Sequence, residues 1–404
     1  MLGLLAGTAV ANDDPAPLGG GAVAPDAEAD LASLEDVRLE QIGRYESGIF
    51  AEGGAEIVDY HPPTQRLFVV NADLGGVDVL DVSDPTTPEK VGEIDATGGV
   101  DGVSSANSVS TSADLVAVAL EAEVAQDPGR VGLYDPETLD LRGTATVGPL
   151  PDKVTFTPDG ERVLVANEGE PTSDYAFDPR GSVSVVDVSA GADAATVDTA
   201  GFTAFDGIEE ALRERGIRIF GPGASASQDF EPEYVTVSED SSTAWVSLQE
   251  NNAIAVVDVE SAEVTELLPL GFKDHSLDGN ELDASNEDGG VNVRNWPVFG
   301  ILQPDAIGAY SPDGDQYIVT ANEGDSRDYD SFSEEVEVSE LRLDPDAFDF
   351  DDVEGVDSVE ELQRPENLGA KNTTTTLGDV DGDGLLEEIY VFGGRSFSIF
   401  TTDG

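Results

Sequence analysis

The stretch PDKVTFTPDGERVLVANEG at residues 151–169, followed by GSVSVVDV at residues 181–188, contains the unit from which this chain is built. It holds three short runs in which apolar residues alternate with polar ones, as expected for strands that bury one face. Pro158 and the Asp159-Gly160 pair place a tight turn between the first two runs. The stretch therefore predicts a small antiparallel sheet of up-and-down strands.

The same order of runs recurs along the chain. Further copies cover residues 56–82, 107–135, 231–258, 303–324 and 376–400. Strands that repeat with a period of 40 to 50 residues or somewhat more indicate a β-propeller, with one blade per copy, whereas a parallel β-helix requires a shorter and stricter period. We therefore predict an all-β protein, a β-propeller of seven blades whose last blade is incomplete in this chain, with a closing strand at residues 37–45.

The chain divides into three segments. Residues 1–11 are apolar and are expected to be the remnant of a signal peptide. Residues 12–34 form an acidic, flexible spacer, and residues 35–404 form the propeller. Two insertions interrupt the repeats, a helical one near residues 206–219 and a long polar loop at residues 272–299. Long ordered loops on a scaffold often carry function.

Composition narrows the possible partners. The chain has 19 basic and 84 acidic residues, a net charge of −65, and such a field repels nucleic acid and anionic lipid. Strong acidity with few lysines is typical of proteins that work in molar salt, where the Debye length is about 3 Å. An acidic calcium-binding protein would share part of this bias. The chain has no cysteine, which excludes disulfides and cysteine-based metal sites, and no run of about 20 apolar residues that would predict a transmembrane segment.

Polar residues follow the second strand of several copies. Because equivalent strand ends of a propeller lie on one face, we predict that these residues surround the central channel and bind a ligand there. The predicted ligand-binding residues are Asn71, Asn167, Glu168, Gln249, Glu250, Asn322, Glu323, Asp325, Arg327 and Asp328. Their oxygen atoms suit calcium or magnesium, although the amides could equally cap turns. Arg327 either positions an anionic group of a substrate or pairs with neighbouring acids.

The sequence DVDGDGLLE at residues 379–387 predicts a metal site. Its acidic residues occupy positions 1, 3, 5 and 9, and a glycine occupies position 6, as in loops that wrap one calcium ion. The predicted metal ligands are Asp379, Asp381, Asp383 and Glu387. Position 12 is Tyr390 and no helices are expected on either side, so the loop departs from the EF-hand and resembles the calcium loops of integrin-type propellers. A structural calcium is expected here, and a solvated acidic turn is the alternative.

Several longer runs resemble one known family. They are VANEGEP at residues 165–171, IFGPG at 219–223, GFKDHSL at 271–277, LDAS at 282–285, NWPVFG at 295–300, QPDAI at 303–307 and TANEGDSRDY at 320–329. With these runs the chain resembles the choice-of-anchor I proteins, which are similar to YVTN-type surface-layer propellers, and its acidity resembles that of haloarchaeal proteins. The resemblance covers residues from about 34 to the end. It implies a secreted or cell-surface propeller whose relatives carry different C-terminal anchors.

Two functions stay open. The first is a metal-stabilised, non-catalytic propeller that binds a surface polymer, a protein or a small molecule. The second is a calcium-dependent phosphoesterase, similar to alkaline phosphatase or phytase, in which clustered cations orient phosphate and activate water at the acidic face. No basic cluster accompanies the acids, and a lactonase-like or quinone-dependent oxidoreductase has no motif of its own in the sequence. The two histidines, His61 and His275, are too far apart in the sequence to define a site.

Overall fold

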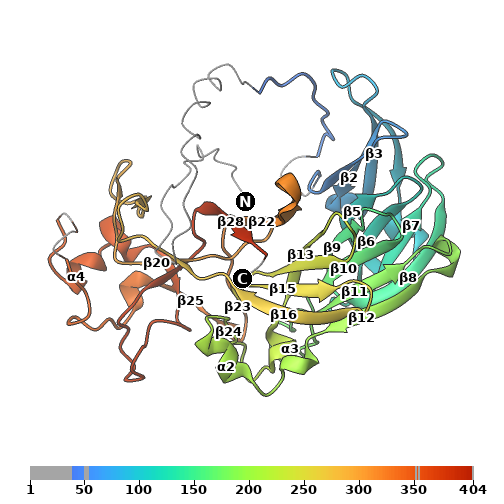
Figure 1. Cartoon of the computed structure of the whole chain (residues 1–404). Helices are drawn as coiled ribbons and strands as arrows, with labels where there is room; N and C mark the ends of the chain where they lie inside the picture. The colour runs from blue at the N-terminus through green and yellow to red at the C-terminus, as the bar shows by residue number, and fades with distance from the viewer. Residues whose placement is uncertain (1–38, 50–53, 351–352, 354, 403–404) are drawn as a thin grey trace.

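The computed structural model describes residues 39–49, 54–350, 353 and 355–402 (Figure 1). The predictions for residues 1–11 and 12–34 lie outside these residues. Four sheets of four antiparallel strands follow one another, each an up-and-down meander in chain order. This arrangement confirms the all-β propeller fold predicted from the repeats, and we call the sheets blades.

The strands of these blades are short and evenly spaced. In the first blade they are β1 (Val58–His61), β2 (Arg66–Asn71), β3 (Gly76–Asp81) and β4 (Glu89–Ile94), and in the second β5 (Val103–Thr111), β6 (Val116–Ala122), β7 (Pro128–Tyr134) and β8 (Leu141–Pro149). In the third they are β9 (Pro151–Phe156), β10 (Arg162–Asn167), β11 (Ser182–Asp187) and β12 (Thr196–Gly201), and in the fourth β13 (Pro232–Val237), β14 (Thr243–Leu248), β15 (Ala253–Asp258) and β16 (Glu263–Pro269).

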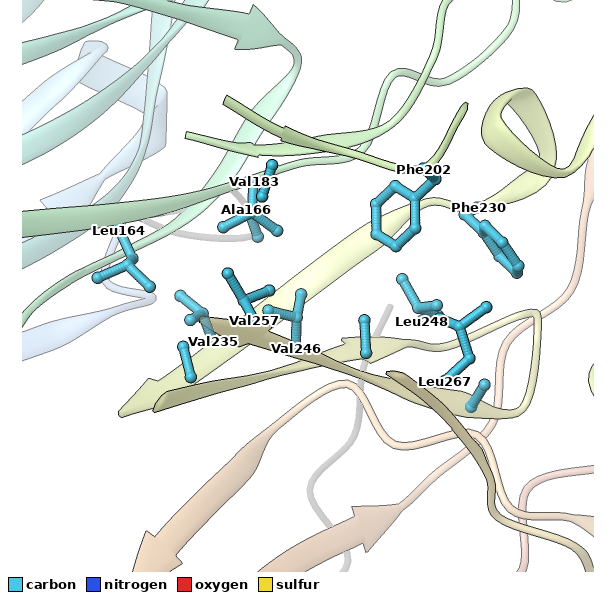
Figure 2. Packing of buried hydrophobic residues seen from close by; sticks show 14 of the residues in the cluster. Leu164, Ala166, Val183, Phe202, Phe230, Val235, Val246, Leu248, Val257 and Leu267 are labelled. Atoms are coloured by element: carbon cyan, nitrogen blue, oxygen red, sulfur yellow. The ribbon is translucent and has the colours of Figure 1, made fainter. Parts of the chain in front are cut away.

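Successive blades meet through their first strands. β1 contacts β5, β5 contacts β9, and β9 contacts β13. Apolar side chains fill the space between blades: Figure 2 shows Leu164 and Val183 of the third blade facing Val235 and Val246 of the fourth. Full burial of such a side chain stabilises the fold by about 1.5–3 kcal/mol, so these layers hold the first strands in fixed positions around a common centre.

The fifth blade is interrupted. It contains β21 (Ile307–Tyr310), β22 (Tyr317–Asn322) and β28 (Ser396–Thr401), and β28 pairs antiparallel with β22 so that Asn322 lies opposite Ser396. The predicted sixth copy at residues 376–400 therefore does not form a blade of its own, because its last strand completes the fifth. The sequence pattern cannot show this pairing, since the chain leaves the sheet for residues 323–395. The number of blades stays a prediction.

A second core lies beside the propeller, in what we call the side unit, residues 272–302 and 323–395. Its main sheet has the order β17 (Phe272–Asp274), β20 (Phe299–Ile301), β27 (Tyr390–Phe392), β26 (Asn372–Thr374) and β25 (Glu335–Glu337). Two small hairpins are β18 (Leu282–Asp283) with β19 (Val293–Arg294), and β23 (Asp328–Tyr329) with β24 (Phe332–Ser333). Trp296, Leu362 and Ile389 are buried in its core. The predicted loop at residues 272–299 thus contains strands, which are too short for alternation to be visible in the sequence.

Helices are few and short. The helices are α1 (Ala96–Gly99), α2 (Glu209–Glu214), α3 (Ala226–Asp229) and α4 (Val359–Leu362), with single turns η3 (Ala72–Leu74), η4 (Ala192–Ala194), η5 (Thr203–Phe205), η6 (Pro312–Gly314), η7 (Val338–Glu340) and η8 (Pro365–Gly369). α2 is the helix expected in the insertion near residues 206–219. No helix in the described part of the chain is long and apolar enough to cross a membrane.

The predicted closing strand is absent from residues 39–45, the part of it that the structure describes. These residues form no strand and pair with none of the described strands. The Tyr45 hydroxyl reaches the Asp78 carboxylate at 3.4 Å, so this segment lies against the first blade instead of joining the fifth.

Candidate ligand and metal sites

The predicted amides occupy equivalent strand ends and are buried. Asn167 at the end of β10 donates to the hydroxyls of Ser182 and Ser184 on β11. Asn322 at the end of β22 donates in the same way to Ser396 and Ser398 on β28. These amides tie the second strand to the third, so their observed role is structural.

The amides of the two other blades also have protein partners. Asn71 ends β2, and its side-chain oxygen accepts from the backbone N–H of Leu74. Gln249 follows β14 and donates to the carbonyl oxygen of Gln303. The sequence left open whether these amides cap turns, and Asn71 does so.

Carboxylates from the third and fourth blades converge beside these amides. Asp152 on β9, Glu168 after β10 and Glu233 on β13 each place an oxygen atom within 4.8 Å of the other two. Further acidic residues interact electrostatically with these three or with one another. We call the whole set the mouth, and it comprises Asp152, Glu168, Glu170, Glu231, Glu233, Glu250, Asp305, Glu323 and Asp325.

The mouth disfavours negative charge. Burial, reinforced by Asp305, raises the pKa of Asp152 to about 7, and burial also raises the pKa of Glu250 to about 7. The pKa values of Glu168 and Glu233 are well above the ordinary value for the same reason, with repulsion from neighbouring acids added. Such groups either hold protons near neutral pH or need a cation beside them.

Arg327 is occupied by neighbouring acids. Its Nη1 donates to Asp229 Oδ1 at 2.8 Å, its Nη2 to the Asp229 carbonyl at 2.6 Å, and its Nε to Glu231 Oε2 at 3.2 Å. The side chain is buried, and Arg218 forms a second buried ion pair with Glu334. The geometry therefore supports local pairing of Arg327, and not the positioning of an anionic substrate group.

The two arginines also join the side unit to the propeller. Their guanidinium carbons lie 4.2 Å (Arg218) and 4.7 Å (Arg327) from the centre of the Phe220 ring. Arg327 belongs to the side unit, whereas Phe220 and Asp229 belong to the connection that leads into the fourth blade. Asp328, the remaining predicted ligand, is exposed on β23.

The predicted calcium loop brings its four carboxylates together. Asp379, Asp381, Asp383 and Glu387 each place an oxygen within 4.8 Å of the others. Backbone N–H groups already orient them, because Asp379 accepts from Gly382 and Gly384 and Glu387 accepts from Val380. Gly382 and Gly384 have φ values of +80° and +86°, which side chains other than glycine rarely adopt. The residues present fit a hard divalent cation.

Several residues of the mouth were not predicted from the sequence. Asp152, Glu233 and Asp305 each follow a proline at the entry to the first strand of a blade, in the pairs Pro151-Asp152, Pro232-Glu233 and Pro304-Asp305. This repeated proline-acid pair was the available signal. The histidines are structural: His61 bonds to Thr64, and His275 bonds to the carbonyl of Asn280.

Comparison with known proteins identifies the family and adds no function. The family model "Choice-of-anchor I domain" matches residues 56–404. Hydrazine synthase of Kuenenia stuttgartiensis is 15% identical with a TM-score of 0.42, and the match covers 84% of this chain and 71% of that one. The Cps50 (Swd1) β-propeller domain of Myceliophteria thermophila is 10% identical with a TM-score of 0.39, and the match covers 67% of this chain and 81% of that one. A protein from Lactobacillus plantarum is 14% identical with a TM-score of 0.40, covering 67% and 64%. No curated protein matches the chain.

Proposed function

Since the chain belongs to the choice-of-anchor I domain family, we propose that it is a secreted, cell-surface binding propeller, stabilised by calcium and adapted to high salt. The family indicates a surface-associated propeller. Secretion, ligand binding, calcium and salt adaptation are the parts that we propose.

The mouth is the observation that supports binding. It brings together acidic side chains from two blades, with Asp152 on the first strand of the third blade, Glu233 on the first strand of the fourth, and Glu168 directly after β10. Gathering these acids in a partly buried place costs stability, because each charged group loses part of its hydration and repels the others. A set of residues that is costly to the fold and converges on one point is expected to serve binding.

Calcium is proposed for the loop at residues 379–387. The loop offers four carboxylates and no nitrogen or sulfur ligand, and this donor set suits calcium. Leu386 and Ile389, next to the loop, pack in the core of the side unit. A cation bound there would therefore stabilise the side unit.

A phosphatase assay separates the binding protein from the phosphoesterase. The full chain is assayed in molar salt on a panel of phosphate esters, with calcium and with chelator. We expect no turnover, because both arginines next to the mouth are engaged in ion pairs and cannot hold a phosphate group. Calcium-dependent turnover that is lost in Glu323→Gln and in Asp325→Asn would replace the proposal with the phosphoesterase.

Binding itself is tested with acidic, neutral and basic polysaccharides immobilised on a sensor surface. We expect one class to be retained by the wild-type chain and lost in Glu323→Gln. The exposed substitution Glu263→Gln on β16 removes the same charge away from the mouth and serves as the matched control. If no class is retained, or if the two variants behave alike, the mouth is not the binding surface for such polymers.

A further inference from the structure

We propose that the mouth holds a divalent cation between the third and fourth blades, bound by Asp152, Glu168 and Glu233, with the buried carboxylate of Glu250 nearby. This site is distinct from the calcium loop at residues 379–387. The inference deepens the proposed function, since it names the first ligand of the mouth, but it can be tested without any polymer or substrate.

The spacing of the oxygens fits one ion. Calcium lies about 2.3–2.6 Å from each oxygen ligand, so two oxygens on opposite sides of one ion are at most about 5 Å apart. The oxygens of Asp152, Glu168 and Glu233 all lie within 4.8 Å of one another. No side-chain motion larger than a small adjustment is needed to place all three around a single cation.

Glu250 provides an independent observation. Its side chain is only 6% exposed, and its Oε2 atom has no hydrogen-bond partner in the described structure. A buried carboxylate oxygen without a partner costs stability, because it has lost its hydration and gained no hydrogen bond in return. Its charge is among those that raise the pKa values of both Glu168 and Glu233, so it lies near them, next to the three oxygens that are within 4.8 Å of one another. A cation bound by the three clustered carboxylates would offset the charge of this oxygen.

The protein's own cations next to the mouth do not take this position. Arg327 directs its guanidinium to Asp229 and Glu231. Lys153 follows Asp152 in β9, but its ammonium lies over the ring of Tyr234, 4.3 Å from the ring centre. It offsets the charge of Asp152 only in part. The position among the three clustered carboxylates is therefore open to a cation from solution.

The donor set limits the kind of cation. It contains carboxylate oxygen only, which favours calcium, magnesium or manganese over zinc or copper. Asp152 and Glu233 lie on first strands, which the packing between blades holds in place, so the site is formed before the cation arrives. The ion would use water or the ligand of the mouth to complete its coordination.

Calcium titration of the chelator-treated full chain in molar potassium chloride tests the site. By calorimetry we expect two binding sites in the wild-type chain and one in Asp381→Asn/Asp383→Asn, which removes only the loop site. Asp152→Asn/Glu233→Gln should also leave one, and the combination of all four changes none. Glu263→Gln/Glu266→Gln on β16 is the matched control and should keep both. Two sites in a folded Asp152→Asn/Glu233→Gln variant would overturn the proposal.

A second measurement leaves the mouth untouched, in case its variants fail to fold. The Asp381→Asn/Asp383→Asn variant keeps all mouth residues, and its melting temperature should still be higher with calcium than with chelator. An unchanged melting temperature would overturn the mouth site. Neither measurement includes a polymer or an ester, so failure of the cation site and failure of the proposed function would be recognised separately.

Discussion

The mouth and the calcium loop use the same chemical group in opposite ways. In the loop, four carboxylates come from nine consecutive residues, are largely exposed and accept hydrogen bonds from the backbone of the same loop. In the mouth, the carboxylates come from separate parts of the chain, the three clustered ones are half-buried, and they repel one another. The loop is therefore ordered by its own backbone, whereas the mouth is ordered by the packing of the whole propeller and remains electrostatically costly.

The largest expected effect concerns the charge balance of the mouth. Arg327→Met would leave Asp229 and Glu231 buried without their partner, and breaking a buried ion pair in this way costs about 3–5 kcal/mol. Chemical denaturation in molar salt measures the change.

Arg364→Met is the control, because Arg364 pairs with Glu361 at the surface of the side unit. Such a pair is worth about 0–1 kcal/mol. Equal losses of stability in the two variants would show that breaking the buried ion pairs of Arg327 costs no more than breaking an exposed one.

The next effect concerns the loop. With calcium about 100-fold above its dissociation constant, a site that binds only the folded chain adds about 2.7 kcal/mol to the free energy of unfolding. Asp381→Asn/Asp383→Asn should remove this gain and change little in chelator. Denaturation with calcium and with chelator measures both free energies of unfolding. If calcium stabilises the variant as much as the wild-type chain, the stabilising calcium binds elsewhere.

A smaller effect is the pH dependence of folding stability, which should come from the mouth and not from the loop. The pKa of Asp152 is raised from 3.8 to about 7, and that of Glu250 from 4.5 to about 7. The folded chain then binds more protons than the unfolded chain between these values, so stability without calcium should fall as pH rises from about 4 to about 7. Melting temperatures across this range, with chelator present, measure the slope.

Variants of the two sites should respond differently to pH. Glu233→Gln removes a carboxyl group whose own pKa is raised well above its ordinary value and should flatten the slope, whereas Asp381→Asn in the loop should leave it unchanged. Saturating calcium should also flatten it in the wild-type chain. A slope that is the same in Glu233→Gln would mean that the mouth acids do not set the pH dependence.

The smallest expected difference concerns salt. Exposed charges are screened at molar ionic strength, where the Debye length is about 3 Å, but buried charges are screened much less. Raising potassium chloride should therefore weaken calcium binding by the loop more than binding by the mouth. Titration of the two double variants, each retaining one site, at increasing salt gives the two affinities. Parallel losses would contradict the assignment of one partly buried and one exposed site.

The sequence predicted the local features and missed the non-local ones. The loop at residues 379–387 could be read from spacing alone, because each of its ligands is positioned by neighbours in the chain. The blades could be predicted because each is a meander. The pairing of β28 with β22 could not be predicted, since nothing near Ser396 indicates a partner before residue 323.

The mouth could be predicted from the sequence only in part. Glu168 and Glu250 were predicted from their place after a second strand, but Asp152 and Glu233 were not, although a proline precedes each in the same way. Alternation shows which face of a first strand is buried between blades, but it does not show which strand ends meet at the centre. From the sequence, Arg327 could either position an anionic group or pair with neighbouring acids. Only the positions of Asp229 and Glu231 decide for pairing.

The interruption of the fifth blade has a consequence for the order of folding. β22 ends and β28 begins opposite each other, so the blade can close only after residues 323–395 bring their two ends together. Pairing across so long a segment slows folding more than it costs stability, because the entropy of loop closure grows by only about 0.6 kcal/mol for each doubling of length. Calcium that compacts the side unit should hasten this step, and pulsed hydrogen exchange at the amides of β28 during refolding should then show earlier protection with calcium than with chelator.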